Sequence, residues 1–487
     1  MTREEFLEKL KDIQKMKCET QTLELKSALH GCPKNLHDTL SSFSNQDDGG
    51  VIIFGVDESN DYCESGVYDA QDLQKKINAQ CLEMEPAVRP LLTVVEKDAR
   101  SFVAAEIPGL DVSERPCYYR GRGRIKGAYI RVGDSDEHMT EYEIYSYEAF
   151  RKKYQDDIRE VPRASLAALD QDALTAYLEK LKQGKPRLAQ LGDTDIYELM
   201  SVTRNGAVTL SAVLLFSLYP QAYFPQLCIT AVALAGREMG ETVVPGERFL
   251  DNQRIEGTIP EMLETALQFV RRNMRTKVVI DPHTGRREDR TDYPMEAVRE
   301  AVLNALVHRD YSIHTEGMPV QLLMFEDRME IHNPGGIYGR LTVDQLGKMQ
   351  PDTRNPVLAS ALETLGVTEN RYSGIPTIRR AMADYHLPAP IFRDERGSFI
   401  VVFNKQQPET SIEPPVGLSA EDEALLEFCQ TPRTRKEIST FLNLSTVSYA
   451  IKKHVMPLVE QGWILLTEPN APSSHKQKYV TNQEKWT

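Results

Sequence analysis

The chain has 487 residues, of which 41% are hydrophobic and 27% charged, and its formal net charge at pH 7 is -14. This length exceeds what one hydrophobic core accommodates and predicts about three domains, while the ordinary composition excludes wholesale disorder. The negative net charge excludes a uniformly basic nucleic-acid-binding protein, but it is compatible with a local basic segment.

The sequence lacks the features of a secreted or membrane protein. Its first residues, "MTREEFLEKLKDIQKMKCET", are charged and amphipathic, and no run approaches the roughly 18 apolar residues of a membrane span. The seven cysteines form no C-x-x-C pair, which disfavours a disulfide framework and a thiolate zinc site. We therefore expect a cytoplasmic protein with free thiols.

The first 150 residues alternate patterns typical of strands and helices. "VIIFGV" (51–56) and "SFVAAEIP" (101–108) predict strands, and "DAQDLQKKINAQCLEM" (69–84) predicts a helix. The later segment "RPCYYRGRGRIKGAYIRVG" interleaves basic residues with tyrosines, as either a solvated hairpin or a nucleic-acid-binding surface does. The candidate nucleic-acid contacts of this domain are Lys26, Arg120, Arg122, Arg124, Lys126 and Arg131.

Three motifs in this region occur in a recognisable order: "ETQTLELKSALH", "FSNQDDGGVIIFGV" and "YIRVG". Together they resemble the Schlafen-AlbA domain, a nucleic-acid-associated α/β fold, over about residues 15–140. The resemblance implies that residues 1–150 form such a domain. In Schlafen nucleases two glutamates and an aspartate hold a metal ion for RNA cleavage.

That likeness implies a candidate nuclease site at Glu19 and Glu24, with Asp57 as the third carboxylate. Glu58 or Asp61 could take the place of Asp57. Three neighbouring oxygen ligands suit Mg²⁺ or Mn²⁺. The alternative is that Glu24 and Lys26 are exposed strand residues on one face, two apart, and we favour simple nucleic-acid binding over cleavage.

Residues 151–285 are predicted to be a connecting α/β region. "VTLSAVLLFSLYPQAYFPQLCITAVALAG" begins like a helix, turns between Pro220 and Pro225 and ends like a strand. The stretch Ile259 to Met274 predicts a strongly amphipathic helix with Pro260 in its first turn. We expect these apolar stretches to pack the flanking domains or to form a subunit interface.

The stretch "EAVREAVLNALVHRDYSIHTEG" predicts an apolar helix that carries one polar stripe. Glu300, Asn304 and His308 are four residues apart, and each step of four rotates by only about 40° around a helix. An amide oxygen is a hard ligand for Mg²⁺, and a carboxylate one turn away can polarise an attacking water. From the helix alone, a stripe that faces solvent is an equally good explanation.

The downstream segments favour a binding site. "MPVQLLMFEDRMEIHNPGG" predicts two strands that meet near Glu326 and Asp327, followed by a glycine turn whose backbone could approach a ligand. In "RYSGIPTIRRAM", Gly374 precedes a helix, as in phosphate-binding cradles.

Taken together, "EAVLNALVHRDYS", "DRMEIHNPGGI", "TRNPVLASAL" and "RYSGIPTIRRA" resemble a divergent Bergerat-type ATP-binding domain of the gyrase, chaperone, histidine kinase and mismatch-repair superfamily. Such domains occur behind Schlafen-type domains in bacterial regulators. The resemblance implies a domain at 286–405, with Glu300 as general base and Asn304 as the magnesium ligand. The nucleotide-binding positions it implies are Asn304, His308, Arg309, Asp310, Asn333, Gly335, Gly336, Arg371 and Gly374.

One departure from the superfamily pattern bears on activity. The adenine-binding aspartate of a D-x-G-x-G motif is absent, and Asn333 in "NPGG" occupies its place. An amide can still pair with adenine, so binding is favoured over turnover. The "HRD" triplet has no downstream DFG and no G-x-x-x-x-G-K-[ST] occurs, which excludes a protein kinase and a P-loop ATPase.

The C-terminal part follows a Pro-rich polar segment that predicts a linker at 406–418. Residues 419–487 resemble a winged helix-turn-helix, with three helices and strands at "WILL" and "KQKYVT". A helical protein-docking module would have the same core. The candidate recognition-helix contacts are Ser445, Thr446, Ser448, Lys452 and Lys453.

The sequence thus predicts a multidomain α/β and α+β protein, with a Schlafen-AlbA-like α/β domain, a Bergerat-like α/β sandwich and a winged helix. The leading hypothesis is a DNA-binding transcriptional regulator that binds ATP with Mg²⁺ or Mn²⁺, switches with nucleotide, hydrolyses it weakly at most and forms a homo-oligomer. The alternative is a metal-dependent Schlafen-type ribonuclease that acts on RNA or tRNA in defence or stress.

Overall fold

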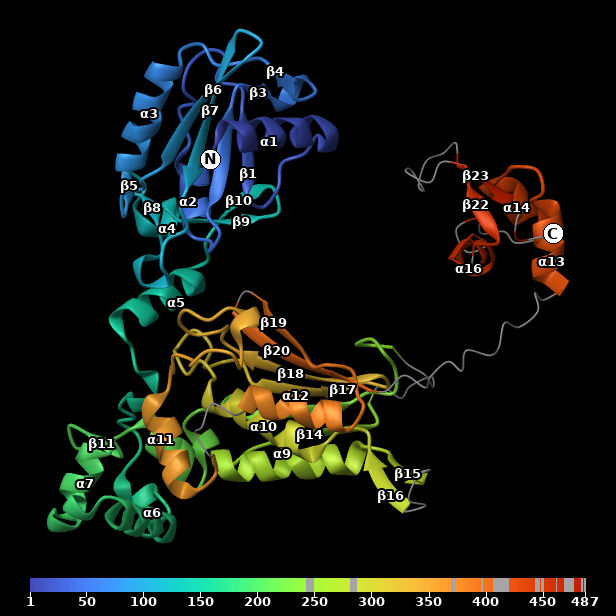
Figure 1. Ribbon diagram of the computed structural model, residues 1–487. Coiled ribbons are helices and arrows are strands. Elements are labelled where there is room, and N and C mark those ends of the chain that lie inside the picture. Colours follow the sequence, from blue (N-terminus) through green and yellow to red (C-terminus); the bar gives the residue numbers. More distant parts are fainter. Residues whose placement is uncertain are drawn as a thin grey trace. The chain divides into compact units, whose positions relative to one another are not determined.

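A computed structural model describes residues 1–241, 249–280, 287–368, 374–395, 397–405, 420–442, 447, 451–460, 462–467, 477–482 and 485 (Figure 1). Within these residues the chain is a multidomain mixed α/β protein with several sheets. It divides into two compact units, Met1–Gln406 and Gln407–Thr487. No helix in the described part is both long enough and apolar enough to cross a membrane.

The N-terminal part of the first unit is built on a four-stranded sheet of order β1-β2-β7-β6. Side chains alternate across strand β2, so Ile52 and Phe54 face one side and Ile53 the other. Helix α1 covers the side of Ile53, while α2 and α3 cover the opposite side. The predicted strands at 51–56 and 101–108 and the helix at 69–84 are confirmed. The elements are α1 (Arg3–Met16), β1 (Leu23–Lys26), α2 (His37–Ser44), β2 (Gly50–Phe54), α3 (Ala70–Leu82), β6 (Leu91–Lys97) and β7 (Arg100–Ile107).

Smaller elements complete this part of the chain. Two short pairs, β3 (Val56–Asp57) with β4 (Cys63–Glu64) and β5 (Met84–Glu85) with β8 (Tyr118–Tyr119), flank the main sheet. The basic segment forms the short helix α4 (Gly123–Gly127) and the hairpin of β9 (Tyr129–Val132) and β10 (Ser135–His138).

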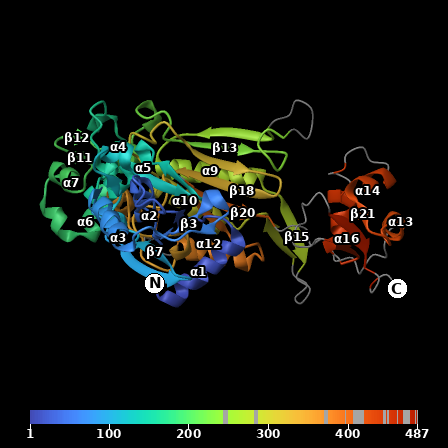
Figure 2. The same cartoon turned by 90° about the horizontal axis from the view of Figure 1, so that it is seen from above.

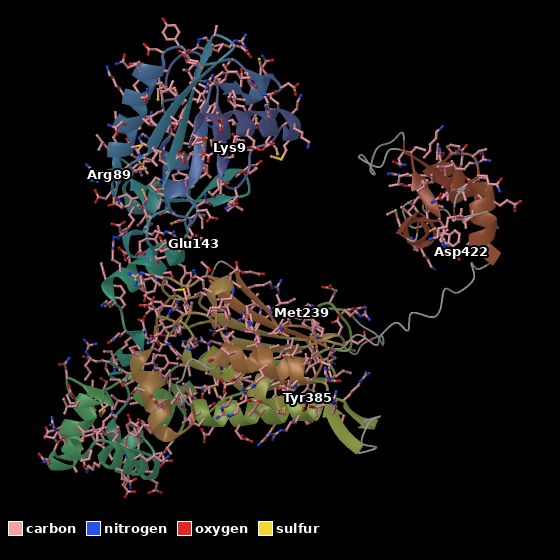
Figure 3. All side chains as sticks on the ribbon, in the orientation of Figure 1. Lys9, Arg89, Glu143, Met239, Tyr385 and Asp422 are labelled. Atoms are coloured by element: carbon pink, nitrogen blue, oxygen red, sulfur yellow. The ribbon has the colours of Figure 1, made fainter. Side chains whose placement is uncertain are left out.

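Helix α5 (Glu141–Lys152) follows this hairpin. Its N-terminus is closed by a capping box in which Thr140 and Glu143 exchange hydrogen bonds; Glu143 is labelled in Figure 3. Because these bonds satisfy backbone groups that a helix leaves unpaired at its start, α5 has a defined first turn.

The next segment is mainly helical. It contains α6 (Gln171–Gly184), α7 (Asp193–Leu199), the two-stranded pair β11 (Thr203–Arg204) and β12 (Ala207–Val208), and α8 (Leu210–Phe216). All seven residues of α8 are buried, which matches the apolar start predicted for this stretch. A short helical turn at Pro220–Ala222 then leads into strand β13, as predicted.

A six-stranded sheet of order β14-β13-β17-β18-β20-β19 forms the largest part of the unit. Only β13 and β17 pair in parallel, and the hairpin predicted near Glu326 and Asp327 joins β17 to β18. Helices α9, α10 and α12 cover one face of this sheet (Figures 1 and 2). The strands are β13 (Ile229–Ala233), β14 (Asp251–Ile255), β17 (Val320–Met324), β18 (Arg328–Pro334), β19 (Ile391–Glu395) and β20 (Ser398–Asn404).

The helices are α9 (Ile259–Asn273), α10 (Met295–Val307), α11 (Pro356–Leu365) and α12 (Gly374–Asp384), and a further hairpin joins β15 (Thr276–Ile280) to β16 (Arg287–Thr291). Strands β13 and β14 come from the segment predicted to connect two domains. They lie in the same sheet and share one hydrophobic core with the residues after 286, because α9 packs on the sheet beside α10. The sheet therefore crosses the boundary predicted at residue 285.

The second unit contains α13 (Ala420–Phe428), β21 (Arg433–Thr434), α14 (Arg435–Phe441), a helical turn at Ile451–Val455 that continues as α16 (Met456–Glu460), β22 (Ile464–Leu466) and β23 (Lys478–Thr481). The strands form a three-stranded sheet of order β21-β23-β22. This order of helices and strands is the one expected of a winged helix. The predicted linker at 406–418 lies outside the described residues.

The buried Asp157 fixes the start of α11. Its Oδ2 accepts hydrogen bonds from the backbone N–H groups of Val357 (2.9 Å) and Leu358 (3.1 Å), in the first turn of that helix. Burial raises the pKa of this carboxyl to about 6 from its ordinary 3.8, although the two backbone bonds oppose the shift. Folded Asp157 thus holds its proton more tightly than the unfolded chain does.

This shift predicts a pH dependence of stability. The contribution of Asp157 to the free energy of unfolding is fully present below pH 3.8 and is lost as the pH rises through 6. Asp157→Asn keeps the acceptor oxygen but does not titrate, so its free energy of unfolding should rise relative to that of wild type by about 2 kcal/mol between pH 4 and 7. Melting temperatures measured across this range check the prediction, with Asp195→Asn on the exposed side of α7 as control. An equal difference at both pH values would contradict it.

Candidate functional site

A cavity of about 800 Å³ lies between α10, β18, the start of α11 and the start of α12. Seven residues singled out from the sequence line this one cavity: Glu300, Asn304, His308, Asn333, Gly335, Gly336 and Gly374. Cavities of this size hold nucleotide-sized ligands. The structure therefore brings the helix stripe, the glycine turn and the glycine-preceded helix together.

The stripe on α10 faces the cavity because the rest of the helix is buried. Eight of its residues, all alanine, valine or leucine, pack in the core, and Glu300 and Asn304 remain on the side that opens to the cavity. His308 follows as the residue that ends the helix, and its N–H donates to the Asn304 carbonyl.

The N-terminus of α12 lies directly against this stripe. A Cβ atom at Gly374 would come within 2.9 Å of Asn304 Nδ2 and 3.2 Å of Glu300 Oε2, so a larger residue would press on both side chains. Helix α12 has 11 residues, and the first turn of a helix carries N–H groups without partners in the helix itself and a partial positive charge. An amide, a carboxylate and a helix N-terminus thus meet at one end of the cavity.

Strand β18 supplies the other polar wall. Its side chains alternate, so Met329, Ile331 and Asn333 face α10, whereas Glu330 and His332 lie on the opposite face and pair with each other at 2.7 Å. Asn333 is only 4% exposed, and its Oδ1 has no hydrogen-bond partner among the described residues. Since a buried unpaired amide oxygen is costly, a ligand with an N–H donor would compensate it.

The glycine turn has a structural reason that differs from the predicted one. Gly335 has a φ of +101°, and an added Cβ would lie 2.6 Å from Asp310 Cβ and would also collide with Arg354. A Cβ at Gly336 would collide with Asp394. Both glycines line the cavity and also leave room for neighbouring protein atoms, and the approach of a ligand to this turn stays a prediction.

Arg309 and Asp310 do not line the cavity, which corrects their assignment as nucleotide contacts. Arg309 is 1% exposed and donates to the backbone carbonyls of Thr315 and Met318. Asp310 is also buried, and it accepts hydrogen bonds from the Tyr142 hydroxyl and the Ser312 N–H, both at 2.8 Å. These two side chains hold the segment that follows α10.

Arg354 is a cavity residue that the sequence reasoning did not single out. It lies just before α11 and is 5% exposed. Its Nη1 is 2.9 Å from Asp310 Oδ2, and its guanidinium lies 5.1 Å from the ring centroid of Tyr338. The "TRNP" motif that contains it was a sequence signal, but its spatial neighbours could not be known from the chain alone.

His308 is neutral at physiological pH in this environment. The surrounding protein desolvates the imidazolium, and the nearby Arg354 guanidinium also disfavours a second positive charge, so the pKa of His308 is lowered to about 4. Its side chain nevertheless remains open to the cavity. It can therefore offer a neutral ring nitrogen to a ligand.

Two of the carboxylates predicted as a nuclease site, Glu19 and Glu24, lie against an arginine, and Asp57 is not part of this cluster. The buried Arg131 pairs with Glu24 at 2.8 Å, Asp136 at 2.9 Å and Glu19 at 3.7 Å. Burial, with the nearby Glu24 charge, raises the pKa of Glu19 to about 7. Among the described residues no three His, Cys, Asp or Glu side chains are placed to hold a metal ion.

Asp57 accepts a hydrogen bond from Ser59 at 2.7 Å. The burial of Arg131 also corrects its assignment as a nucleic-acid contact, because its guanidinium cannot reach a phosphate. Lys26 pairs with Glu24 on the same strand. Arg131 and Glu24 therefore belong to the internal charge balance of the domain, whereas the nucleic-acid role of Lys26, whose side chain is 31% exposed, stays a prediction.

The remaining basic candidates of the N-terminal domain lie at its surface. Arg120, Arg122 and Arg124 each have a carboxylate partner, respectively Glu85, Asp38 and Glu148. Lys126 is exposed. The positive charge of this segment is therefore largely balanced by acidic residues.

Several predicted site residues lie outside the part of the chain that the structure describes. Arg371, Ser445, Thr446 and Ser448 lie outside the described residues, and the side chain of Lys452 does as well. Lys453 is exposed in the helical turn before α16.

The glycine geometry predicts the effect of a single methyl group. Gly335→Ala should lower the melting temperature and weaken ligand binding, because its Cβ meets backbone and side-chain atoms at a positive φ, at a cost of about 1–3 kcal/mol. Gly184→Ala is the matched control, since nothing lies within 4 Å of its Cβ. Thermal denaturation of both variants tests this, and equal melting temperatures would refute it.

Comparison with known proteins assigns three segments of the chain. Residues 19–140 match the family model "Schlafen, AlbA_2", and residues 317–403 match "Putative ATP-dependent DNA helicase recG C-terminal". Residues 422–481 match "Filamentation induced by cAMP protein Fic-like, C-terminal domain". The second match begins after α10 and includes Asn333, the glycine turn and Gly374.

Two solved structures are similar to the chain, one over nearly its whole length and one over about a quarter of it. The DIP2311 protein from Corynebacterium diphtheriae is 17% identical, with 99% of this chain and 97% of that chain covered and a TM-score of 0.40. The N-terminal domain of a putative ATP-dependent DNA helicase RecG-related protein from Nitrosomonas europaea is 26% identical, with 27% and 90% covered and a TM-score of 0.22. No curated protein matches the chain.

Proposed function

Because this chain carries a Schlafen AlbA_2 domain, a domain like the C-terminal part of RecG-type helicases and a Fic-like C-terminal domain, we propose that it is an ATP-responsive DNA-binding regulator. Such a combination is typical of ATP-dependent DNA-binding and transcription-regulating proteins. The observation that carries the proposal is the convergence of Glu300, Asn304 and Asn333 on one cavity.

The two ends of the cavity suit the two ends of ATP. Asn333, with its unpaired buried amide oxygen, would accept a hydrogen bond from the amino group of adenine. The phosphates would lie at the N-terminus of α12, where backbone N–H groups and the helix dipole favour anions. The cavity walls between these ends include apolar side chains such as Ile331 and Val401, which suit a base and a sugar.

The residues present also fit a divalent cation bound with the phosphates. Asn304 would supply a hard oxygen ligand, and Mg²⁺ commonly takes its other ligands from phosphates and water. Glu300, one turn away, would orient or polarise a water next to the phosphates. With an amide rather than a carboxylate at position 333, we infer that the site binds ATP more effectively than it hydrolyses it.

Nucleic acid would be bound mainly by the C-terminal unit. Its helices and three-stranded sheet have the order of a winged helix, and the turn that carries Lys453 precedes its last helix. The N-terminal basic segment would contribute less, because its arginines are already paired with carboxylates. Since the Arg131 cluster offers no three-carboxylate metal site, we do not favour the ribonuclease alternative.

Nucleotide binding by the full chain tests the first part of the proposal. Asn304→Ala should weaken the affinity for a fluorescent ATP analogue with Mg²⁺ by roughly tenfold or more, because it removes a ligand to the cation–phosphate group. Gln268→Ala, which removes an amide from the exposed side of α9, should have no effect. If Asn304→Ala binds the analogue as wild type does, the nucleotide assignment is wrong.

Binding to duplex DNA tests the second part. Fluorescence anisotropy should show salt-dependent binding, and Lys453→Glu should weaken it by roughly tenfold, because it reverses the charge of a group we place near phosphates. Lys185→Glu, at an exposed position in the helical segment, is the control. Equal affinities of the two variants would exclude DNA binding through this turn.

A further inference from the structure

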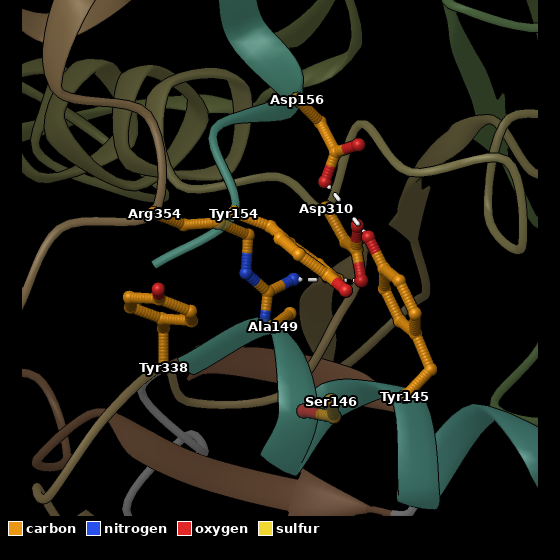
Figure 4. A pocket seen from close by; sticks show the side chains of 8 residues that line it. All are labelled: Tyr145, Ser146, Ala149, Tyr154, Asp156, Asp310, Tyr338 and Arg354. Carbon is orange, nitrogen blue, oxygen red and sulfur yellow. Dashed lines mark hydrogen bonds and ion pairs between the residues drawn. The ribbon is translucent and has the colours of Figure 1, made fainter. Parts of the chain in front are cut away.

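Helix α5 of the N-terminal domain reaches the nucleotide cavity through two buried side chains. The Tyr142 hydroxyl on α5 donates to Asp310 Oδ2 at 2.8 Å, and the same oxygen is 2.9 Å from Arg354 Nη1. Asp310 lies outside the cavity, but Arg354 lines it. A continuous polar chain therefore runs from α5 to the cavity wall, and Figure 4 shows its Arg354 end beside α5.

Other contacts of α5 involve the loop that covers the same cavity. The ring of Phe150 lies 5.4 Å from that of Tyr338, edge to face, and the guanidinium of Arg340 lies 5.3 Å from the Phe150 ring. Arg340 also pairs with Asp111 of the N-terminal domain at 3.3 Å. The segment that begins with the glycine turn is thus held on one side by α5 and borders the cavity on the other.

Arg354 is placed to respond to a phosphate. It is almost fully buried, its carboxylate partner is Asp310, and its Nη2 makes a long hydrogen bond of 3.4 Å to the Gly336 carbonyl. Its charge already lowers the pKa of His308 on the cavity wall. Because a guanidinium binds phosphate oxygens with paired hydrogen bonds, an anion in the cavity would compete with Asp310 for it.

We propose that Arg354, which lies beside the glycine turn next to Asn333, binds the phosphate nearest the adenosine and, through Asp310 and Tyr142, couples occupancy of the cavity to helix α5, while the outer phosphates lie at the start of α12. This inference rests on the proposed binding of ATP. When the guanidinium is shared with a phosphate, the buried Asp310 carboxylate depends more strongly on the Tyr142 hydroxyl for its stabilisation. The hydrogen bond between Tyr142 and Asp310 therefore strengthens, and the first turn of α5 becomes more firmly held.

The phosphate contact has a test of its own. Arg354→Lys keeps the positive charge but loses the planar fork, so it should weaken the binding of a non-hydrolysable ATP analogue by about tenfold and leave the binding of adenosine unchanged. An equal loss for both ligands would overturn the phosphate contact, since it would indicate a general change of the cavity.

The coupling is tested by hydrogen exchange of the full chain with and without the ATP analogue and Mg²⁺. We expect slower amide exchange in residues 141–152 when the analogue is bound. Tyr142→Phe should abolish this difference while the affinity for the analogue changes by less than about threefold, because Tyr142 does not line the cavity. Tyr145→Phe is the matched control, since it removes a similar bond from the same helix, to Asp156 at 2.9 Å, and should retain the difference.

The outcomes separate the two proposals. If wild type does not bind the analogue, both the proposed function and the coupling fail. If it binds but exchange in 141–152 is unchanged, or if Tyr142→Phe responds as wild type does, the coupling alone is overturned. A response lost equally in Tyr142→Phe and Tyr145→Phe would also overturn it, because it would show a general sensitivity of α5.

Discussion

The burial of helix α10 is the constraint on which the candidate site depends. This helix packs between the six-stranded sheet and two other helices, and its alanine, valine and leucine side chains fill the core. A helix surrounded in this way has only one direction left for polar groups, since a buried carboxylate or amide without a partner is costly. Glu300 and Asn304 are therefore held at the cavity wall by the packing of their apolar neighbours.

Much of this arrangement could be predicted from the chain because it depends on periodicity. The spacing of four between Glu300 and Asn304, the two-residue alternation along β18 and the glycine at the start of α12 are local patterns with direct structural meaning. The same patterns could not show that β13 and β14 extend this sheet, because pairing between distant segments leaves no local signal. They also could not show whether a charged residue would be buried.

Two arginine–carboxylate clusters explain the misassigned residues. In the N-terminal domain the buried guanidinium of Arg131 pairs with Glu24 and Asp136. In the part of the chain with the six-stranded sheet, Arg354 pairs with Asp310. In sequence, Arg131 belongs to a basic surface segment and Asp310 to a signature for nucleotide contact. Burial reverses both interpretations, because a charge removed from water must be neutralised by a partner within the protein. The roles of such residues follow from distant partners that a single sequence does not identify.

The same arginine–carboxylate pairs show how a chain with a net charge of -14 can differ from place to place in its attraction for anions. Acidic residues pair with Arg120, Arg122 and Arg124, so we expect this domain to attract a nucleic-acid backbone only weakly. At the cavity the balance is different, because among the described residues Arg354 pairs with one carboxylate, that of Asp310, and a ligand phosphate could share the guanidinium. A molecule of this composition is therefore better suited to sense a small polyanion inside a closed site than to bind a long one over its whole surface. We therefore propose that nucleic-acid affinity is concentrated in a limited segment, whose engagement the nucleotide would control.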